Sequence, residues 1–305
     1  MRGLAFSLFL AVGVAGCGPK APPPAGDTTG ADVVLLEVTH QIQLSKPSTP
    51  LGKNLRLAAA PTGDWYVLDT DHNRLLHFDS QGNLRRESGG LGSGPLEFDT
   101  PVDIDADGLS VWVLDRQNRR VVRLDRELNY IEEMPVAAAS DDLSGALWYD
   151  ALALTSAGDL LLLDRQEPRV LRISPGGDLQ ATYGGFGLGT GRLAEPVDVA
   201  SAANGDVYVA DGRGILTYDR SGNFRGEAAT AARAIAVAGG DDDAWAVLAS
   251  GDMNRIVGNR SLRVTVDPAH GRPVPVAITV VRGRGQGPAI LDLGLTVWLL
   301  APFDL

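Results

Sequence analysis

Cysteine is almost absent from this chain of 305 residues, because Cys17 is the only one. No disulfide can form within the chain, so a hydrophobic core has to hold the fold together. Hydrophobic residues make up 44% of the sequence and charged residues 21%, which is ordinary for a globular protein.

Positive charge is also scarce, with 27 lysines and arginines against 38 acidic residues and a formal net charge of −11. A chain of this charge is a poor ligand for nucleic acid and for anionic lipid headgroups. We therefore expect no nucleic-acid partner, and any membrane contact has to come from something other than charge.

Long hydrophobic runs are missing as well. The apolar stretch Leu4 to Val14 is too short to span a bilayer and follows Arg2, which is the pattern of a signal peptide. It ends in VAGC at Cys17, which resembles the lipobox of bacterial lipoproteins. That resemblance implies cleavage before Cys17, lipidation of this residue and, because Gly18 follows, the outer membrane where the source has one. The alternative is an ordinary secretory signal containing a chance cysteine.

These features divide the chain into three parts. Residues 1–16 are the expected lipoprotein signal peptide. Residues 17–30 combine the lipidated cysteine with a tether that has too few large apolar side chains to form a core. Residues 31–305 contain strands and turns without a convincing helix, and they repeat.

The repeated unit is a strongly apolar strand that ends in Asp, followed by a short turn and a second strand that begins with Arg. The strand ends at Asp69, Asp115, Asp164 and Asp211 are spaced by 46, 49 and 47 residues, and we align Leu248 and Ala301 with them. Repeats of this length that contain several short strands indicate a β-propeller.

The units resemble NHL repeats, which form six-bladed propellers. The resemblance extends to Gly-rich segments after Ser88, Tyr183 and Val281, which we interpret as linkers between blades. It implies an all-β, six-bladed propeller with four strands per blade. Because this fold serves binding proteins, lyases and hydrolases alike, it does not determine the function.

The last repeat is incomplete, since it provides only the segments AILDL and TVWLL as inner strands. The segment Val33 to Leu44 precedes the first repeat and has no repeat of its own. We expect it to supply the outer strand of the sixth blade, which closes the ring and removes an exposed sheet edge.

Three Asp–Arg pairs share one spacing: Asp69 with Arg74, Asp115 with Arg120, and Asp164 with Arg169. In each, the Asp ends the second strand of a blade and the Arg begins the third. We favour a structural ion pair repeated in successive blades, and the alternative is a ring of charged ligand contacts.

The turns between strands 2 and 3 and the linkers between blades open on the same side of a propeller, here called the loop-rich face. Its longest predicted loop spans residues 249–261 and offers Met253, Arg255 and Arg260 for ligand binding, because it combines apolar and cationic groups. Arg116 and Arg213, in neighbouring turns, complete this candidate set.

A channel-mouth site is the alternative. Asp103 and Asp198 begin the inner strands of two blades at matching positions, and Asp150 is one residue out of that register. Converging carboxylates can bind Ca²⁺, and six-bladed lactonases and esterases resemble this arrangement. The other entrances, which we place at Arg56, Ala234 and Ile290, lack the further ligands that the resemblance requires.

The four histidines are expected to lie far apart, which disfavours a zinc site or a Ser–His–Asp triad. They are His40, His72, His77 and His270.

The sequence therefore favours a non-enzymatic, monomeric, lipid-anchored propeller of the cell envelope that needs no cofactor. We expect it to bind a protein, peptide or glycan through the loop-rich face. The alternative is a metal-dependent hydrolase or lyase with Ca²⁺ at Asp103 and Asp198.

Overall fold

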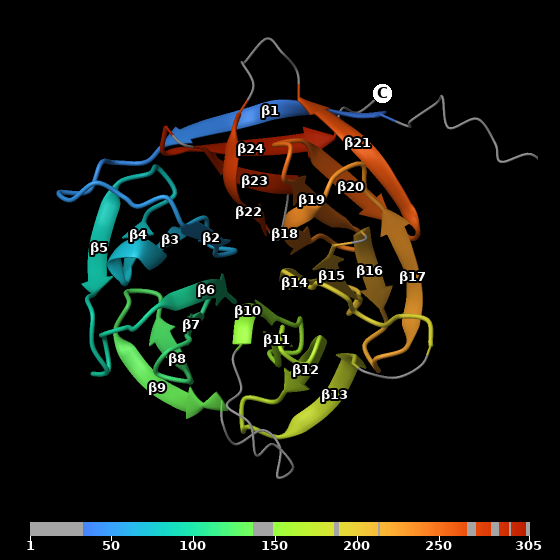
Figure 1. Cartoon of the computed structure of the whole chain (residues 1–305). Helices are drawn as coiled ribbons and strands as arrows, with labels where there is room; N and C mark the ends of the chain where they lie inside the picture. Colours follow the sequence, from blue (N-terminus) through green and yellow to red (C-terminus); the bar gives the residue numbers. More distant parts are fainter. Residues whose placement is uncertain are drawn as a thin grey trace, which may run out of the picture. The chain divides into compact units, whose positions relative to one another are not determined.

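The computed structural model describes residues 33–136, 149–185, 189–212, 214–266, 273–281, 287–292 and 294–302. Residues Asp32–Leu305 form one compact unit, in which short antiparallel sheets stand as blades around a centre (Figure 1). None of the described helical segments is long and apolar enough to cross a membrane.

Each blade has four strands, counted outward from the centre. The first strands are β2 (Leu55–Ala59), β6 (Pro101–Ala106), β10 (Tyr149–Leu154), β14 (Asp198–Ser201), β18 (Ala234–Gly239) and β22 (Pro275–Val281). The second strands are β3 (Trp65–Asp69), β7 (Ser110–Asp115), β11 (Leu160–Asp164), β15 (Val207–Asp211), β19 (Ala244–Leu248) and β23 (Gly287–Asp292).

The outer half of each blade follows in the same order. The third strands are β4 (Arg74–Phe78), β8 (Arg120–Asp125), β12 (Arg169–Ile173), β16 (Gly214–Tyr218), β20 (Met253–Val257) and β24 (Thr296–Pro302). The fourth strands are β5 (Leu84–Gly89), β9 (Tyr130–Pro135), β13 (Leu179–Gly184), β17 (Phe224–Ala229), β21 (Arg260–Val266) and β1 (Val33–Gln43), and the short 3₁₀ helix η1 (Thr70–His72) follows β3.

The core lies between blades. Every residue of β3, β7, β11, β15 and β19 is buried, as expected for a strand with another blade on each side. Between blades 1 and 2, for example, Tyr66 and Leu68 pack with Val111 and Val113. The apolar second strand is therefore the main source of hydrophobic contacts from blade to blade.

The N-terminal strand closes the ring as predicted. β1 pairs antiparallel with β24 as the outer strand of the sixth blade, with Leu36 fully buried. It also pairs in parallel with β21, so that blades 5 and 6 share one eight-stranded sheet (Figure 1). One strand thus covers the open edges of two blades, which the sequence did not indicate.

Our strand assignment in the sixth blade was wrong by one strand. The inner strand is β22, and AILD belongs to β23, where Asp292 pairs with Pro275 as Asp115 pairs with Pro101. Asp292, and not Ala301, is thus the sixth counterpart of the repeated Asp. The linker between blades that we predicted after Val281 is therefore wrong, because the strands before and after it, β22 and β23, belong to one blade. Residues 282–286 themselves lie outside the described residues.

The long loop predicted at residues 249–261 was also wrong. Residues 253–257 form β20, and β21 begins at Arg260 after a two-residue turn that pairs Val257 with Arg260. The turn is Gly258–Asn259, a dipeptide suited to a tight hairpin, and Gly258 has φ +58°. This Gly-Asn pair was the local signal that indicated a strand on either side.

Candidate functional site

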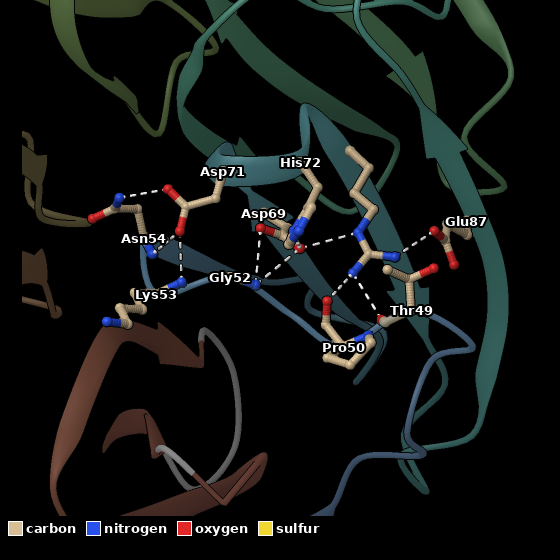
Figure 2. Close-up of polar contacts among 10 residues, drawn as sticks. Thr49, Pro50, Gly52, Lys53, Asn54, Asp69, Asp71, His72 and Glu87 are labelled. Atoms are coloured by element: carbon tan, nitrogen blue, oxygen red, sulfur yellow. Dashed lines mark hydrogen bonds and ion pairs between the residues drawn. The ribbon is translucent and has the colours of Figure 1, made fainter.

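The loop-rich face is held together by buried ion pairs, the first of which is Asp69–Arg74. Asp69 is fully buried and accepts hydrogen bonds from Arg74 Nε at 3.0 Å and from the Gly52 N–H at 3.2 Å (Figure 2). The Arg74 guanidinium also donates to the carbonyls of Thr49 and Pro50, at 2.9 and 2.8 Å, and to Glu87 at 2.6 Å. The pair thereby fixes the linker that enters blade 1.

Asp115 and Arg120 repeat this arrangement in blade 2. Arg120 Nε donates to Asp115 at 3.0 Å, and Asp115 accepts the Asp99 N–H at 2.8 Å. The other guanidinium nitrogens bind the carbonyls of Ser93, Gly94 and Glu97 and the carboxylate of Glu133. We call this unit, a buried Asp–Arg pair bound to an inter-blade linker, the linker clamp.

The clamp weakens around the ring. In blade 3 the Asp164–Arg169 distance is 3.6 Å, and the residues 137–148 that lead into this blade lie outside the described residues. In blade 4 Asp211 still accepts the Ala194 N–H of its linker at 2.6 Å, although Gly214 stands where the Arg would be. The predicted ion pairs of blades 1 to 3 are thus confirmed as structural contacts.

The central channel is a cavity of about 80 Å³ lined by the inner strands. Asp103 and Asp198 occupy equivalent positions, because they pair with Leu114 and Ala210, the residues before the repeated Asp. This confirms their predicted match. The equivalent positions in the other blades are Arg56, Ala151, Ala236 and Ala277, so our placement of two entrances at Ala234 and Ile290 was wrong.

Both channel aspartates bind the backbone of the next blade. Asp103 Oδ2 accepts the Leu152 N–H at 2.7 Å, and Asp198 Oδ2 accepts the Val237 N–H at 2.8 Å. Because Leu152 and Val237 belong to the inner strands β10 and β18, each carboxylate joins two adjacent blades. These carboxylates therefore have a structural use that the sequence did not reveal.

The channel raises the pKa values of both aspartates. Burial, with repulsion from Asp198, raises the pKa of Asp103 to about 7, and burial raises the pKa of Asp198 to about 6. Arg56 opposes both shifts, with its Nε 3.7 Å from Asp103. Across the described residues, no group of three or more His, Cys, Asp or Glu side chains is placed to hold a metal ion.

The candidate ligand residues do not come together. Met253 is buried in the core of blades 5 and 6, and Arg255 Nε binds Asp243 at 2.6 Å from the middle of β20. Arg260 is exposed at the start of β21, and Arg213 lies outside the described residues. Arg116 does lie in the turn after β7, where its guanidinium binds Asp150 at 2.8 Å.

The described histidines take part in separate contacts. His72 binds the clamp residue Asp69 at 2.8 Å, and His77 stacks on Tyr66 with 4.8 Å between ring centroids. Burial lowers the pKa of His77. His40 lies exposed on β1, and His270 is outside the described residues.

Two hollows flank the linker into blade 1, which spans residues 44–54. One, of about 350 Å³, lies where blade 6 meets blade 1 and is lined by residues including Lys46, Pro47, Lys53 and Leu295. The other, of about 290 Å³, is lined by the clamp residue Arg74, its acceptor Glu87 and their neighbours. Sequence reasoning missed both, because they form between segments that are distant in the chain.

Comparisons with known proteins agree on the fold. Residues 36–147 match the model of a protein family described as a six-bladed β-propeller. No curated protein matches the chain.

Several solved structures resemble it. Virginiamycin B lyase from Staphylococcus aureus, solved as a catalytically inactive form with quinupristin, is 16% identical, with a TM-score of 0.57 over 82% of this chain and 81% of its own. A putative gluconolactonase is 13% identical, with a TM-score of 0.60 over 87% and 92%. A putative exported protein from Bacteroides fragilis is 12% identical, with a TM-score of 0.54 over 76% and 79%. At these identities the likeness shows the propeller fold alone.

The channel aspartates predict a specific pH dependence. Their pKa values are raised in the folded chain, so between about pH 4 and pH 7 the folded state binds more protons than the unfolded state, and the free energy of unfolding falls as the pH rises. Relative to the double variant Asp103→Asn/Asp198→Asn, the native chain should lose on the order of 5 kcal/mol across this window. Urea unfolding at a series of pH values measures the difference. An equal dependence of the free energy of unfolding on pH in the two proteins would contradict the raised pKa values. The matched control is Glu37→Gln, which removes an exposed carboxylate and should leave the pH dependence of the native chain unchanged.

Proposed function

We propose that this protein is a lipid-anchored, extracytoplasmic binding module that engages a protein, peptide or glycan through its loop-rich face. The observation that supports this most strongly is that the channel carboxylates are hydrogen-bonded to the backbone. Asp103 and Asp198 each bind a backbone N–H of the next blade, and these are the two residues on which a channel-mouth metal site would depend. Each of these carboxylates therefore already has a structural role between blades.

The loop-rich face offers a better surface for recognition. The linker clamps fix the inter-blade linkers of this face. Less conformational entropy of these loops would therefore be lost when a partner binds. Of the two hollows beside the linker 44–54, the larger offers apolar and charged groups together, and the other offers polar and charged groups. Loops positioned by a rigid scaffold are a common location for binding residues.

The lipid anchor rests on the VAGC sequence that ends at Cys17. Two or more acyl chains hold a protein stably at a membrane, whereas one does not. Mass spectrometry of the mature N-terminus should find a diacylglyceryl group on Cys17. An N-terminus created elsewhere, or an unmodified cysteine, would remove the proposed anchoring.

A photo-crosslinking experiment in the native envelope tests the binding face. The photoreactive residue p-benzoylphenylalanine replaces Ser48, which is exposed in the linker 44–54, or Gln81, which is exposed in the turn between β4 and β5 on the opposite side of the blade. We expect a discrete adduct from position 48 and none from position 81.

Two results would contradict the proposal. One is equal labelling from both positions or labelling from position 81 alone. The other is stoichiometric binding of Ca²⁺ by calorimetry that disappears in Asp103→Asn, which would favour the metal-dependent hydrolase or lyase.

A further inference from the structure

The lysines of this chain have an unusual distribution. Among its 27 lysines and arginines only three are lysine, namely Lys20, Lys46 and Lys53. Lys46 and Lys53 both line the 350 Å³ hollow at the junction of blades 6 and 1, here called the junction groove. The folded part thus places its two lysines at one site and uses arginine elsewhere.

Three segments build the junction groove. The linker 44–54 supplies Pro47, Pro50 and Leu51 together with both lysines, the start of β22 supplies Val276, and the turn between β23 and β24 supplies Leu295. The lining is therefore mainly apolar, with the two ammonium groups at exposed positions of the linker. An apolar surface with a few charged groups is typical of a small-molecule site.

Contacts on every side hold the linker in this shape. The Leu44 N–H donates to the Leu295 carbonyl at 2.9 Å, and Arg74 binds the Pro50 carbonyl. Asp71 accepts the Lys53 N–H at 2.6 Å, while the Lys53 side chain extends away from that carboxylate (Figure 2). The groove is thus preformed, and its lysine side chains are not needed for its backbone contacts.

The charge of the groove is opposite to that of the protein. The lining residues include two lysines and one aspartate, Asp292, within a chain of net charge −11. Asp292 already accepts hydrogen bonds from the Gly294 and Thr296 N–H groups and from Trp298 Nε1. Among the described residues no ion pair or hydrogen bond involves the ammonium group of Lys46 or Lys53.

We propose that the junction groove binds a small amphipathic anion. Its carboxylate, sulfonate or phosphate group lies between Lys46 and Lys53, and its apolar body lies against Pro47, Pro50 and Leu295. The volume of about 350 Å³ is in the range of small-molecule pockets. The test of this site does not need the proposed macromolecular partner, because a small molecule can fill the groove in the isolated protein.

Two fluorescent probes test this inference: 8-anilinonaphthalene-1-sulfonate and its uncharged analogue N-phenyl-1-naphthylamine, which lacks the sulfonate. The protein is the mature chain from residue 17 with Cys17→Ser, which has no acyl chain to bind either probe. We expect one saturable site for the sulfonate. Its affinity should fall about fivefold or more in Lys46→Gln/Lys53→Gln and should be retained in Lys46→Arg/Lys53→Arg.

The controls separate the groove from general surface charge. Arg263→Gln removes a cation that is 62% exposed on β21 and should leave the affinity for the sulfonate unchanged. The inference is overturned when the sulfonate does not bind, when both probes bind equally, or when the lysine-to-glutamine variant binds the sulfonate as the native side chains do. None of these results bears on photo-crosslinking from position 48, so the two proposals can fail separately.

Discussion

The linker clamp is the contact on which the loop-rich face depends. An isolated buried carboxylate is strongly unfavourable, and it becomes acceptable only with a cation and further hydrogen bonds. Asp69 and Asp115 meet that condition by binding an Arg and the backbone N–H of an incoming linker at once. The arginines in turn satisfy the carbonyls of the same linkers. A loop that would otherwise leave its polar backbone groups unpaired is thereby fixed to the blade it enters.

A second group of carboxylates joins the blades at the centre. Asp103 and Asp198 bind the inner strand of the following blade, as Asp105 does through the Leu154 N–H at 2.8 Å. The carboxylates that the sequence suggested as ligands of a channel site thus connect adjacent blades. On the loop-rich face the clamps fix the backbone, while side chains such as Lys46 and Lys53 are exposed.

Much of the fold could be predicted from the sequence because four repeats keep the same strong signal, an apolar strand ended by a buried Asp. Closure by the N-terminal strand followed from the incomplete last repeat. The strands of blade 5 were assigned wrongly because Leu248 replaces the repeated Asp. Those of blade 6 were assigned wrongly because the segment GLTVWLL has the apolar pattern of a second strand. The Asp292 register and the Gly258–Asn259 turn were the signals that could have corrected this.

The site was less predictable than the fold. The sequence allowed us to infer that Asp103 and Asp198 occupy matching positions. The N–H groups that donate hydrogen bonds to them belong to other blades, and no sequence motif near either Asp indicates these donors. The junction groove likewise combines segments about 240 residues apart, since Lys46 and Lys53 line it together with Leu295. The scarcity of lysine was visible in the sequence, yet only the structure shows that two of the three share one groove.

The most direct test of this account is the free energy of unfolding of two arginine variants in blade 2. The Arg120 side chain is 8% exposed and holds a clamp. The Arg126 side chain is 44% exposed, and its one ion pair among the described residues is with Glu127 at 3.4 Å. Urea unfolding should show a loss of about 3–5 kcal/mol for Arg120→Ala and less than about 1 kcal/mol for Arg126→Ala. A double-mutant cycle with Asp115→Asn should then assign part of the larger loss to the pair itself. Equal, small losses for both variants would contradict the central role of the linker clamp.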